Sequence, residues 1–229
     1  MTLGKKLLSI NKKIQLVQSK SGYKNSVKII AVTKTHPFSF IKESYKSNIY
    51  SIGENKVQEV EKKFKSFDKM PKIERRFIGH LQSNKVRKCL YLFDTIDTID
   101  SVKLAKKVSN VAKEINKDIA GLIEINTSGE NQKKGFLPTE MSDIQSCLGL
   151  PNLKIVGLMT IGPNTKNTIK VRSAFKNLRE LKDLINSKNK NKNLSELSMG
   201  MSGDYEIAIE EGSTMVRLGT ALFGVRGSL

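Results

Sequence analysis

The chain has 229 residues, of which 38% are hydrophobic and 27% charged, a composition typical of globular proteins with one large α/β domain or two small ones. No run of residues is long and apolar enough to cross a membrane, and the first 20 residues lack the continuous apolar core of a signal peptide. The two cysteines, Cys89 and Cys147, lie far apart and in no metal-ligand spacing. This usage favours a reducing, cytoplasmic compartment.

The net charge of +18 raises the hypothesis of a polyanionic partner such as nucleic acid. The lysines are spread from Lys5 to Lys192, and few aromatic residues lie among them, which argues against a base-stacking platform. The densest basic run, residues 186–193, is an Asn/Lys stretch that we interpret as a solvated loop. We therefore predict no specific nucleic-acid partner and keep a nucleic-acid-associated protein as a lesser alternative, with loose, salt-sensitive association.

The predicted elements begin with an amphipathic helix and continue as alternating strands and helices. The helix covers the first 20 residues, and its candidate buried positions are Leu7, Leu8, Ile14, Leu16 and Val17. Strands are predicted at residues 27–34, 50–53, 76–79, 95–99, 121–126, 155–160, 196–199 and 216–219. Helices are predicted between them at residues 38–47, 55–67, 84–92, 101–116, 139–148, 169–186 and 204–211.

This alternation predicts an α/β fold, a single (β/α)₈ TIM barrel that spans residues 1–229 as one domain, with the N-terminal helix as an addition. A doubly wound open sheet is the alternative. In a barrel the chemistry belongs at the C-terminal ends of the strands. The first predicted strand ends at Lys34, and lysine is rarely buried without a partner. Lys34 is either a nucleophile activated by desolvation or a side chain that reaches out to solvent.

Two turns after the last predicted strands have the composition of a phosphate-binding site. Residues 198–204 form a Gly/Ser turn before a helix, and residues 219–221 form a second small-residue turn. Backbone N–H groups at a helix N-terminus bind phosphate, and in barrels this site commonly follows strands seven and eight. The alternative is that the glycines only permit tight turns, with Ser202 or Asp204 as a helix N-cap. Arg217 is either ion-paired inside the barrel or a donor to a ligand ring.

A lysine and a phosphate cradle at one barrel mouth suggest a ligand that is an aldehyde and carries a phosphate. Pyridoxal 5′-phosphate (PLP) meets both requirements, since its aldehyde forms a Schiff base with lysine. His80 and His36 are the only histidines, and no His, Cys or carboxylate cluster has metal-ligand spacing. We therefore predict PLP as the cofactor and no metal.

Six motifs resemble those of the YggS/PROSC family of pyridoxal-phosphate-binding proteins, also called pyridoxal phosphate homeostasis proteins. The motifs are AVTKTHP (31–37), GENKVQE (53–59), RFIGHLQSNK (76–85), INTSGENQKKG (125–135), GLM (157–159) and LSMGMSGDYEIAIEEGSTMVRLGTALFG (197–224). The resemblance spans nearly the whole chain and implies a barrel similar to the N-terminal domain of bacterial alanine racemase. It further implies that Lys34 forms the Schiff base. The remaining cofactor-binding positions that it implies are Asn55, His80, Met159, Ser198, Met201, Ser202, Arg217, Gly219 and Thr220.

Within that resemblance, Ser202, Gly219 and Thr220 correspond to phosphate contacts, and Arg217 corresponds to the arginine that faces the pyridine nitrogen. A guanidinium stays protonated, so the ring nitrogen would stay neutral and would be a poor electron sink for carbanions. In alanine racemase the second acid/base group is a tyrosine of an additional domain across a dimer interface. The chain ends at Leu229, so we expect no such domain, and we expect Tyr205 to lie outside the barrel.

These expectations favour a carrier over an enzyme. We predict a monomeric, non-catalytic PLP-binding protein that acts in intracellular vitamin B6 homeostasis, with PLP and PLP-requiring apo-enzymes as partners. The alternative is a small PLP-dependent amino-acid racemase.

Overall fold

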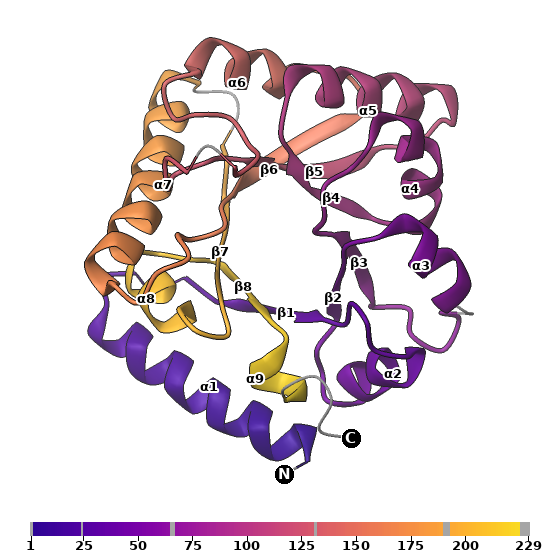
Figure 1. The fold of residues 1–229 in the computed structure, drawn as a ribbon. Helices are drawn as coiled ribbons and strands as arrows, with labels where there is room; N and C mark the ends of the chain where they lie inside the picture. Colours follow the sequence, from indigo (N-terminus) through magenta and orange to yellow (C-terminus); the bar gives the residue numbers. More distant parts are fainter. Residues whose placement is uncertain (1, 24, 65–66, 131, 190–192, 225–229) are drawn as a thin grey trace.

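Eight parallel strands form a closed barrel in the computed structural model, which describes residues 2–23, 25–64, 67–130, 132–189 and 193–224 (Figure 1). The strands follow one another around the barrel in chain order, and β8 pairs with β1. They are β1 (Lys28–Val32), β2 (Ser51–Glu54), β3 (Glu74–Phe77), β4 (Thr95–Ile99), β5 (Ile119–Glu124), β6 (Leu153–Met159), β7 (Glu196–Met201) and β8 (Met215–Leu218). The predicted barrel is confirmed, and closure between β8 and β1 excludes the open sheet.

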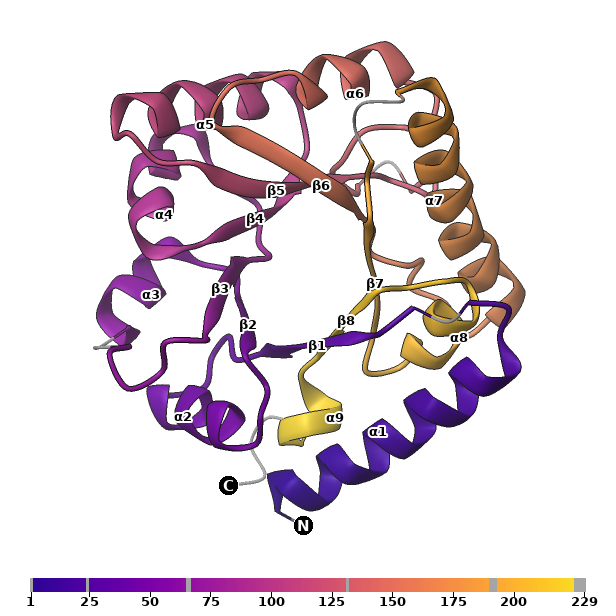
Figure 2. The ribbon, with the colours of Figure 1, turned by 180° about the vertical axis from the view of Figure 1, so that it is seen from behind.

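Helices surround the barrel on its outer side, as the view from behind also shows (Figure 2). They are α1 (Leu3–Lys20), α2 (Phe38–Lys46), α3 (Val57–Lys63), the 3₁₀ turn η1 (Ser83–Lys85), α4 (Val86–Leu92), α5 (Val102–Glu114), α6 (Met141–Leu148), α7 (Thr168–Lys188), α8 (Tyr205–Glu210) and α9 (Thr220–Phe223). The additional N-terminal helix is confirmed. It packs beside α8 and α9.

The buried face of α1 differs from the prediction at two positions. Ile14 and Val17 are buried as expected, whereas Leu8 and Leu16 are more than half exposed. The 3.6-residue period explains the error, because Leu3, Ile10, Ile14 and Val17 form one stripe that excludes Leu8 and Leu16.

Several element boundaries also differ from the sequence-based expectations. Strand β1 ends at Val32, two residues before Lys34. Helix α7 continues to Lys188, so the Asn/Lys run at 186–193 begins inside a helix, and its residues 190–192 lie outside the described part of the chain. Helix α3 ends at Lys63, and the predicted extension to residue 67 crosses residues 65–66, which also lie outside it.

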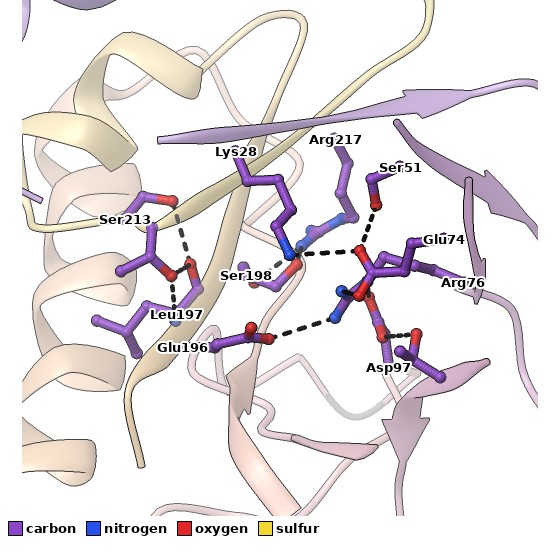
Figure 3. Close-up of polar contacts among 12 residues, drawn as sticks. Lys28, Ser51, Glu74, Arg76, Asp97, Glu196, Leu197, Ser198, Ser213 and Arg217 are labelled. Carbon is purple, nitrogen blue, oxygen red and sulfur yellow. Dashed lines mark hydrogen bonds and ion pairs between the residues drawn. The ribbon is translucent and has the colours of Figure 1, made fainter. Parts of the chain in front are cut away.

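The N-terminal end of the barrel contains a buried cluster of charges (Figure 3). Arg76 is 1% exposed, and its Nε donates to the Asp97 carboxylate at 2.8 Å. Its Nη1 lies 2.9 Å from Oε1 of Glu74, and its Nη2 lies 3.4 Å from Oε2 of Glu196. Burial alone would lower the pKa of Arg76, but these three carboxylates outweigh it and raise the pKa.

An apolar layer, contributed by strands on opposite sides of the barrel, also lies in the barrel interior. It consists of Ile30, Leu122, Met159 and Met215. The apolar layer and the charge cluster fill the barrel interior from the N-terminal end. The space for a ligand therefore lies at the opposite end, where the strands have their carboxyl termini.

Candidate functional site

Lys34 lies in a turn beyond the end of β1. The turn is closed by a hydrogen bond of 3.0 Å from the His36 N–H to the Thr33 carbonyl, and the Thr33 N–H donates to the Gly53 carbonyl at 3.1 Å. Thr35 has φ 67°, in the left-handed region that a β-branched residue rarely adopts. The prediction of a strand-end lysine is therefore wrong in detail. The strained turn, and not the strand, sets the position of Lys34.

A buried ion pair lies directly beneath this turn. The Glu54 carboxylate is 1% exposed, accepts a hydrogen bond of 2.5 Å from the Thr33 hydroxyl and pairs with the Lys63 ammonium. The Lys63 ammonium also donates to the Thr33 carbonyl at 2.7 Å. These contacts connect the ends of β1 and β2 to the last turn of α3. The sequence analysis missed both charged residues, although a carboxylate directly before Asn55 in an apolar strand is a usable signal.

A chamber of about 350 Å³ lies on one side of Lys34, toward the ends of β7 and β8. Its walls are formed by Val32, Lys34, His36, Ile78, Ile161, Met201, Ser202, Gly203, Arg217, Gly219, Thr220 and Gly224. Six of the sequence-predicted residues therefore meet here: Lys34, Met201, Ser202, Arg217, Gly219 and Thr220.

Backbone donors converge on the Ser202 hydroxyl at the start of α9. Its Oγ accepts hydrogen bonds from the N–H groups of Gly219 at 3.3 Å and Ala221 at 3.1 Å. The Asp204 carboxylate accepts from the Met201 N–H at 2.6 Å and makes no capping bond to α8. Asp204 occupies the N-cap position of α8, as the helix-cap alternative expects, but its side chain makes no capping hydrogen bond. The two turns instead combine a hydroxyl with backbone N–H groups, the donor set that suits a phosphate.

Arg217 is held rigidly between two strand ends. Its guanidinium is 5% exposed and donates at 2.8 Å to the Ser198 carbonyl, to the Ser198 hydroxyl and to the Thr160 carbonyl. The side chains of Arg217 and Ser198 lie side by side in Figure 3. Burial lowers the pKa of Arg217, although a guanidinium stays protonated. Among the described residues, no carboxylate forms an ion pair with Arg217. The ion-paired alternative is therefore not observed among the described residues, and Arg217 lines the chamber, while its role as a donor to a ligand ring stays a prediction.

A second chamber of about 290 Å³ lies on the other side of Lys34. Its walls are formed by Lys34, Asn55, Ile78, Gly79, His80, Thr98, Glu124, Ile125, Asn126, Lys133, Lys134 and Ile161. Two of the sequence-predicted residues lie here, Asn55 and His80. The Asn55 Oδ1 atom is buried without a hydrogen-bond partner in the described part of the chain. The His80 ring forms a contact of 3.0 Å with the Asp100 carboxylate.

Gly79 is required by the close approach of two strand ends at this chamber. A Cβ atom at Gly79 would lie 2.2 Å from the Asn55 carbonyl oxygen, a distance that no side chain tolerates. Because Gly79 has no side chain, the chain after β3 can lie directly against the Asn55 backbone, and this contact holds Asn55 at the chamber wall.

Glu124 is a second acidic group that the sequence analysis did not single out. It is 7% exposed at the end of β5, and burial raises its pKa to about 7. Asp100 raises this pKa further, while Arg217 and Lys134 oppose the shift. The sequence signal that could have identified Glu124 is the presence of a carboxylate inside the apolar run 121–126.

Met159 and Ser198 lie behind the site and line neither chamber. Met159 is 1% exposed and belongs to the apolar layer inside the barrel. Ser198 is fully buried and orients Arg217. Both residues therefore lie deeper in the barrel than the cofactor-lining positions to which the resemblance assigns them.

Comparison with known proteins places this geometry in a family. Residues 6–227 match the alanine racemase N-terminal domain family. The pyridoxal phosphate homeostasis protein of Aquifex aeolicus is 39% identical over 228 residues, with 99% of each chain covered. That of Vibrio cholerae is 40% identical over 222 residues, which cover 95% of this chain and 93% of the relative. The chain belongs to the pyridoxal phosphate homeostasis protein family.

Solved structures agree with this family assignment. PipY of Synechococcus elongatus, solved with PLP bound, superposes with a TM-score of 0.85 at 30% identity, covering 97% of this chain and all of PipY. An alanine racemase of Clostridium difficile superposes with a TM-score of 0.75 at 17% identity, and the match covers 57% of that chain. This second likeness shows a shared barrel fold only. Within the described residues, no helix combines the length and apolar character needed to cross a membrane.

Proposed function

We propose that this protein binds PLP through a Schiff base on Lys34 and acts in intracellular PLP homeostasis without catalysing a reaction of its own. The observation that carries the proposal is the position of Lys34 between two chambers with different chemistry. One chamber is lined by Ser202, Gly219 and Thr220, and the backbone N–H groups of Gly219 and Ala221 point to the Ser202 hydroxyl. The other offers the unpartnered acceptor of Asn55.

The residues present fit PLP in charge and in hydrogen bonding. The donors around Ser202 would hold the phosphate, and the Asn55 acceptor would receive a donor from the ligand, because buried polar atoms are normally paired. Arg217 would face the ring nitrogen. When bound, PLP supplies an aldehyde carbon that amines attack. This protein's own residues would bind and orient the cofactor. PipY, whose structure contains PLP, supports the assignment.

Arg217 also favours a carrier over the racemase alternative. A guanidinium held by three hydrogen bonds to oxygen atoms cannot give its proton to a pyridine nitrogen, so carbanions on the ring would be poorly stabilised. Tyr205 is buried on α8, outside the barrel, among the side chains that pack against α1. It does not line either chamber. The names of the curated relatives point the same way, since they describe homeostasis and not a reaction.

Delivery of the cofactor to PLP-requiring apo-enzymes, in the cytoplasm and by a monomer, is part of this proposal. The two chambers lie at the same strand ends as the exposed His80, so a partner can approach the site.

An absorbance titration with PLP tests the proposed function. The wild-type protein should develop the visible band of a Schiff base, and Lys34→Ala should abolish the band. Lys154→Ala, which changes an exposed lysine at the N-terminal end of β6, is the matched control and should leave it unchanged. Turnover of any amino acid by the loaded protein would sink the carrier proposal and favour the racemase.

A further inference from the structure

A third chamber, of about 210 Å³, lies between the start of α3 and the η1 turn. Its walls are formed by Asn55, Lys56, Val57, Gln58, Phe77, His80, Leu81, Gln82 and Lys85. All of these residues belong to the motifs GENKVQE (53–59) and RFIGHLQSNK (76–85), of which the proposed function uses only Asn55 and His80. Lys34 does not line this chamber, which is therefore separate from the two chambers that meet at Lys34.

The third chamber carries positive charge that no acidic wall residue balances. Its two lysines are Lys56 and Lys85, and its walls contain no Asp or Glu. Lys56 is exposed and pairs with Glu59 at 2.7 Å, whereas the half-buried Lys85 makes no ion pair with another described residue. A lysine that gives up part of its hydration without gaining a carboxylate favours a nearby anion. Lys85 therefore indicates an anionic ligand.

Two amide side chains at the same rim have unused hydrogen-bonding capacity. Gln58 and Gln82 are exposed, and neither side chain forms a hydrogen bond with another described residue. Each amide nitrogen offers two donors. Behind them Val57, Phe77 and Leu81 are buried, so one side of the chamber is an apolar floor. Hydrogen bonds made against such a floor are stronger than those made in open water, because the local dielectric constant is lower.

We infer that the third chamber binds a small oxyanion, supplied either as inorganic phosphate or as the side-chain carboxylate of an acidic residue on a protein partner. The Lys85 ammonium would supply the charge, and the Gln58 and Gln82 amides would donate further hydrogen bonds. Pockets that enclose whole cofactors usually span about 300–1,000 Å³. A chamber of about 210 Å³ therefore suits one phosphate or carboxylate group and not a second PLP.

The inferred site is independent of the two turns that would hold the cofactor phosphate. None of its three anion-binding side chains lines either chamber at Lys34. It is nevertheless a neighbour of the second chamber, because Asn55 and His80 form part of both walls. A partner whose acidic side chain fills the third chamber would therefore lie beside the space that faces Lys34.

The test follows the backbone amide resonances of the PLP-loaded protein by NMR, at constant ionic strength with chloride as the replaced anion. Inorganic phosphate is one probe, and the other is a blocked glutamate, acetylated at its amine and amidated at its α-carboxyl. Both should shift the resonances of Gln58, Gln82 and Lys85 and reach saturation. The blocked glutamine of the same shape should shift them much less. Tighter binding of phosphate would identify the free ion as the ligand, and tighter binding of blocked glutamate would identify an acidic side chain; either result supports the oxyanion site.

Lys85→Gln should weaken the tighter probe roughly tenfold, the factor expected for one charge-assisted hydrogen bond, and should keep the Schiff-base band. Lys62→Gln removes the same charge from an exposed position of α3 outside the chamber and should leave the affinity almost unchanged. Equal weakening in the two variants would show attraction to the net charge alone and would overturn the inference. Equal shifts with blocked glutamate and blocked glutamine, together with no saturable shift by phosphate, would also overturn it. A wild-type protein without the Schiff-base band would overturn the proposed function, and the same resonances would still decide the oxyanion site.

Discussion

Glu124→Gln should stabilise the cofactor-free protein, and more so at higher pH. The buried carboxyl has its pKa raised from 4.5 to about 7. A carboxyl whose pKa is raised by folding favours the folded state at low pH, and this contribution is lost as pH rises through the folded-state pKa. The relevant window therefore runs from about pH 4.5 to about pH 7.

The magnitude follows from the size of the shift. One pKa unit corresponds to about 1.4 kcal/mol, so a raise from 4.5 to about 7 makes ionised Glu124 cost about 3 kcal/mol above pH 7. Glutamine resembles the protonated carboxyl in shape and carries no charge. At pH 8 the variant should therefore gain about 3 kcal/mol in the free energy of unfolding, and at pH 4.5 it should gain less than about 0.5 kcal/mol.

Urea unfolding of both proteins at a series of pH values measures this difference. For a chain of this length a gain of about 3 kcal/mol raises Tm by roughly 6–12 °C, so thermal unfolding gives an independent check. Asp183→Asn, an exposed carboxylate on α7, is a control that should show no comparable dependence on pH. A stability difference between wild type and Glu124→Gln that is constant from pH 4.5 to pH 8 would refute the reasoning.

Three further predictions concern the charge cluster at the N-terminal end of the barrel and the ion pair and strained turn beside Lys34. Asp97→Asn should lower the free energy of unfolding, measured with urea, by about 3–5 kcal/mol, because the buried Arg76 cation loses its closest carboxylate. A loss below about 1 kcal/mol would contradict the assigned ion pair between Arg76 and Asp97. Lys63→Met should lower the free energy of unfolding by roughly 3 kcal/mol, because Glu54 then lacks its partner under the Lys34 turn. The same variant should bind PLP more weakly in the absorbance titration. Lys62→Met, which changes an exposed residue on the same helix, should have neither effect. Thr35→Asn should raise stability by about 1 kcal/mol, because asparagine tolerates the left-handed conformation; a destabilised variant with an intact Schiff-base band would contradict this account of strain.

Much of the fold could be predicted from the sequence because its signals are local. Short apolar strands alternating with amphipathic helices indicate a barrel, and the Ser101 side chain caps α5 as its position before Val102 suggests. The buried face of α1 was harder to predict, because Leu8 and Leu16 differ from the buried Ile14 only in their angular position around the helix. The end of β1 was misplaced because the left-handed turn at Thr35 has no glycine to mark it.

The site was predictable where single turns carry the chemistry and not where distant residues combine. Ser202 lies in a Gly/Ser turn, and Gly219 and Thr220 lie in a second turn of small residues that the structure brings to the same chamber, so the prediction of a phosphate site could be made from local composition. The Glu54–Lys63 pair depends on α3 returning to the end of β1, and the pKa of Glu124 depends on how completely the barrel covers it. Burial and pairing of this kind follow from tertiary packing, which no spacing rule reports.

Borohydride reduction of the PLP-loaded protein, followed by proteolysis and mass mapping of the peptides, tests the central claim most directly. Reduction converts a Schiff base into a stable adduct, so the labelled lysine is the one that holds the cofactor. The account predicts a single pyridoxyl-phosphate adduct on Lys34, lost in Lys34→Ala. An adduct on Lys63 or Lys133 in place of Lys34, or none at all, would contradict it.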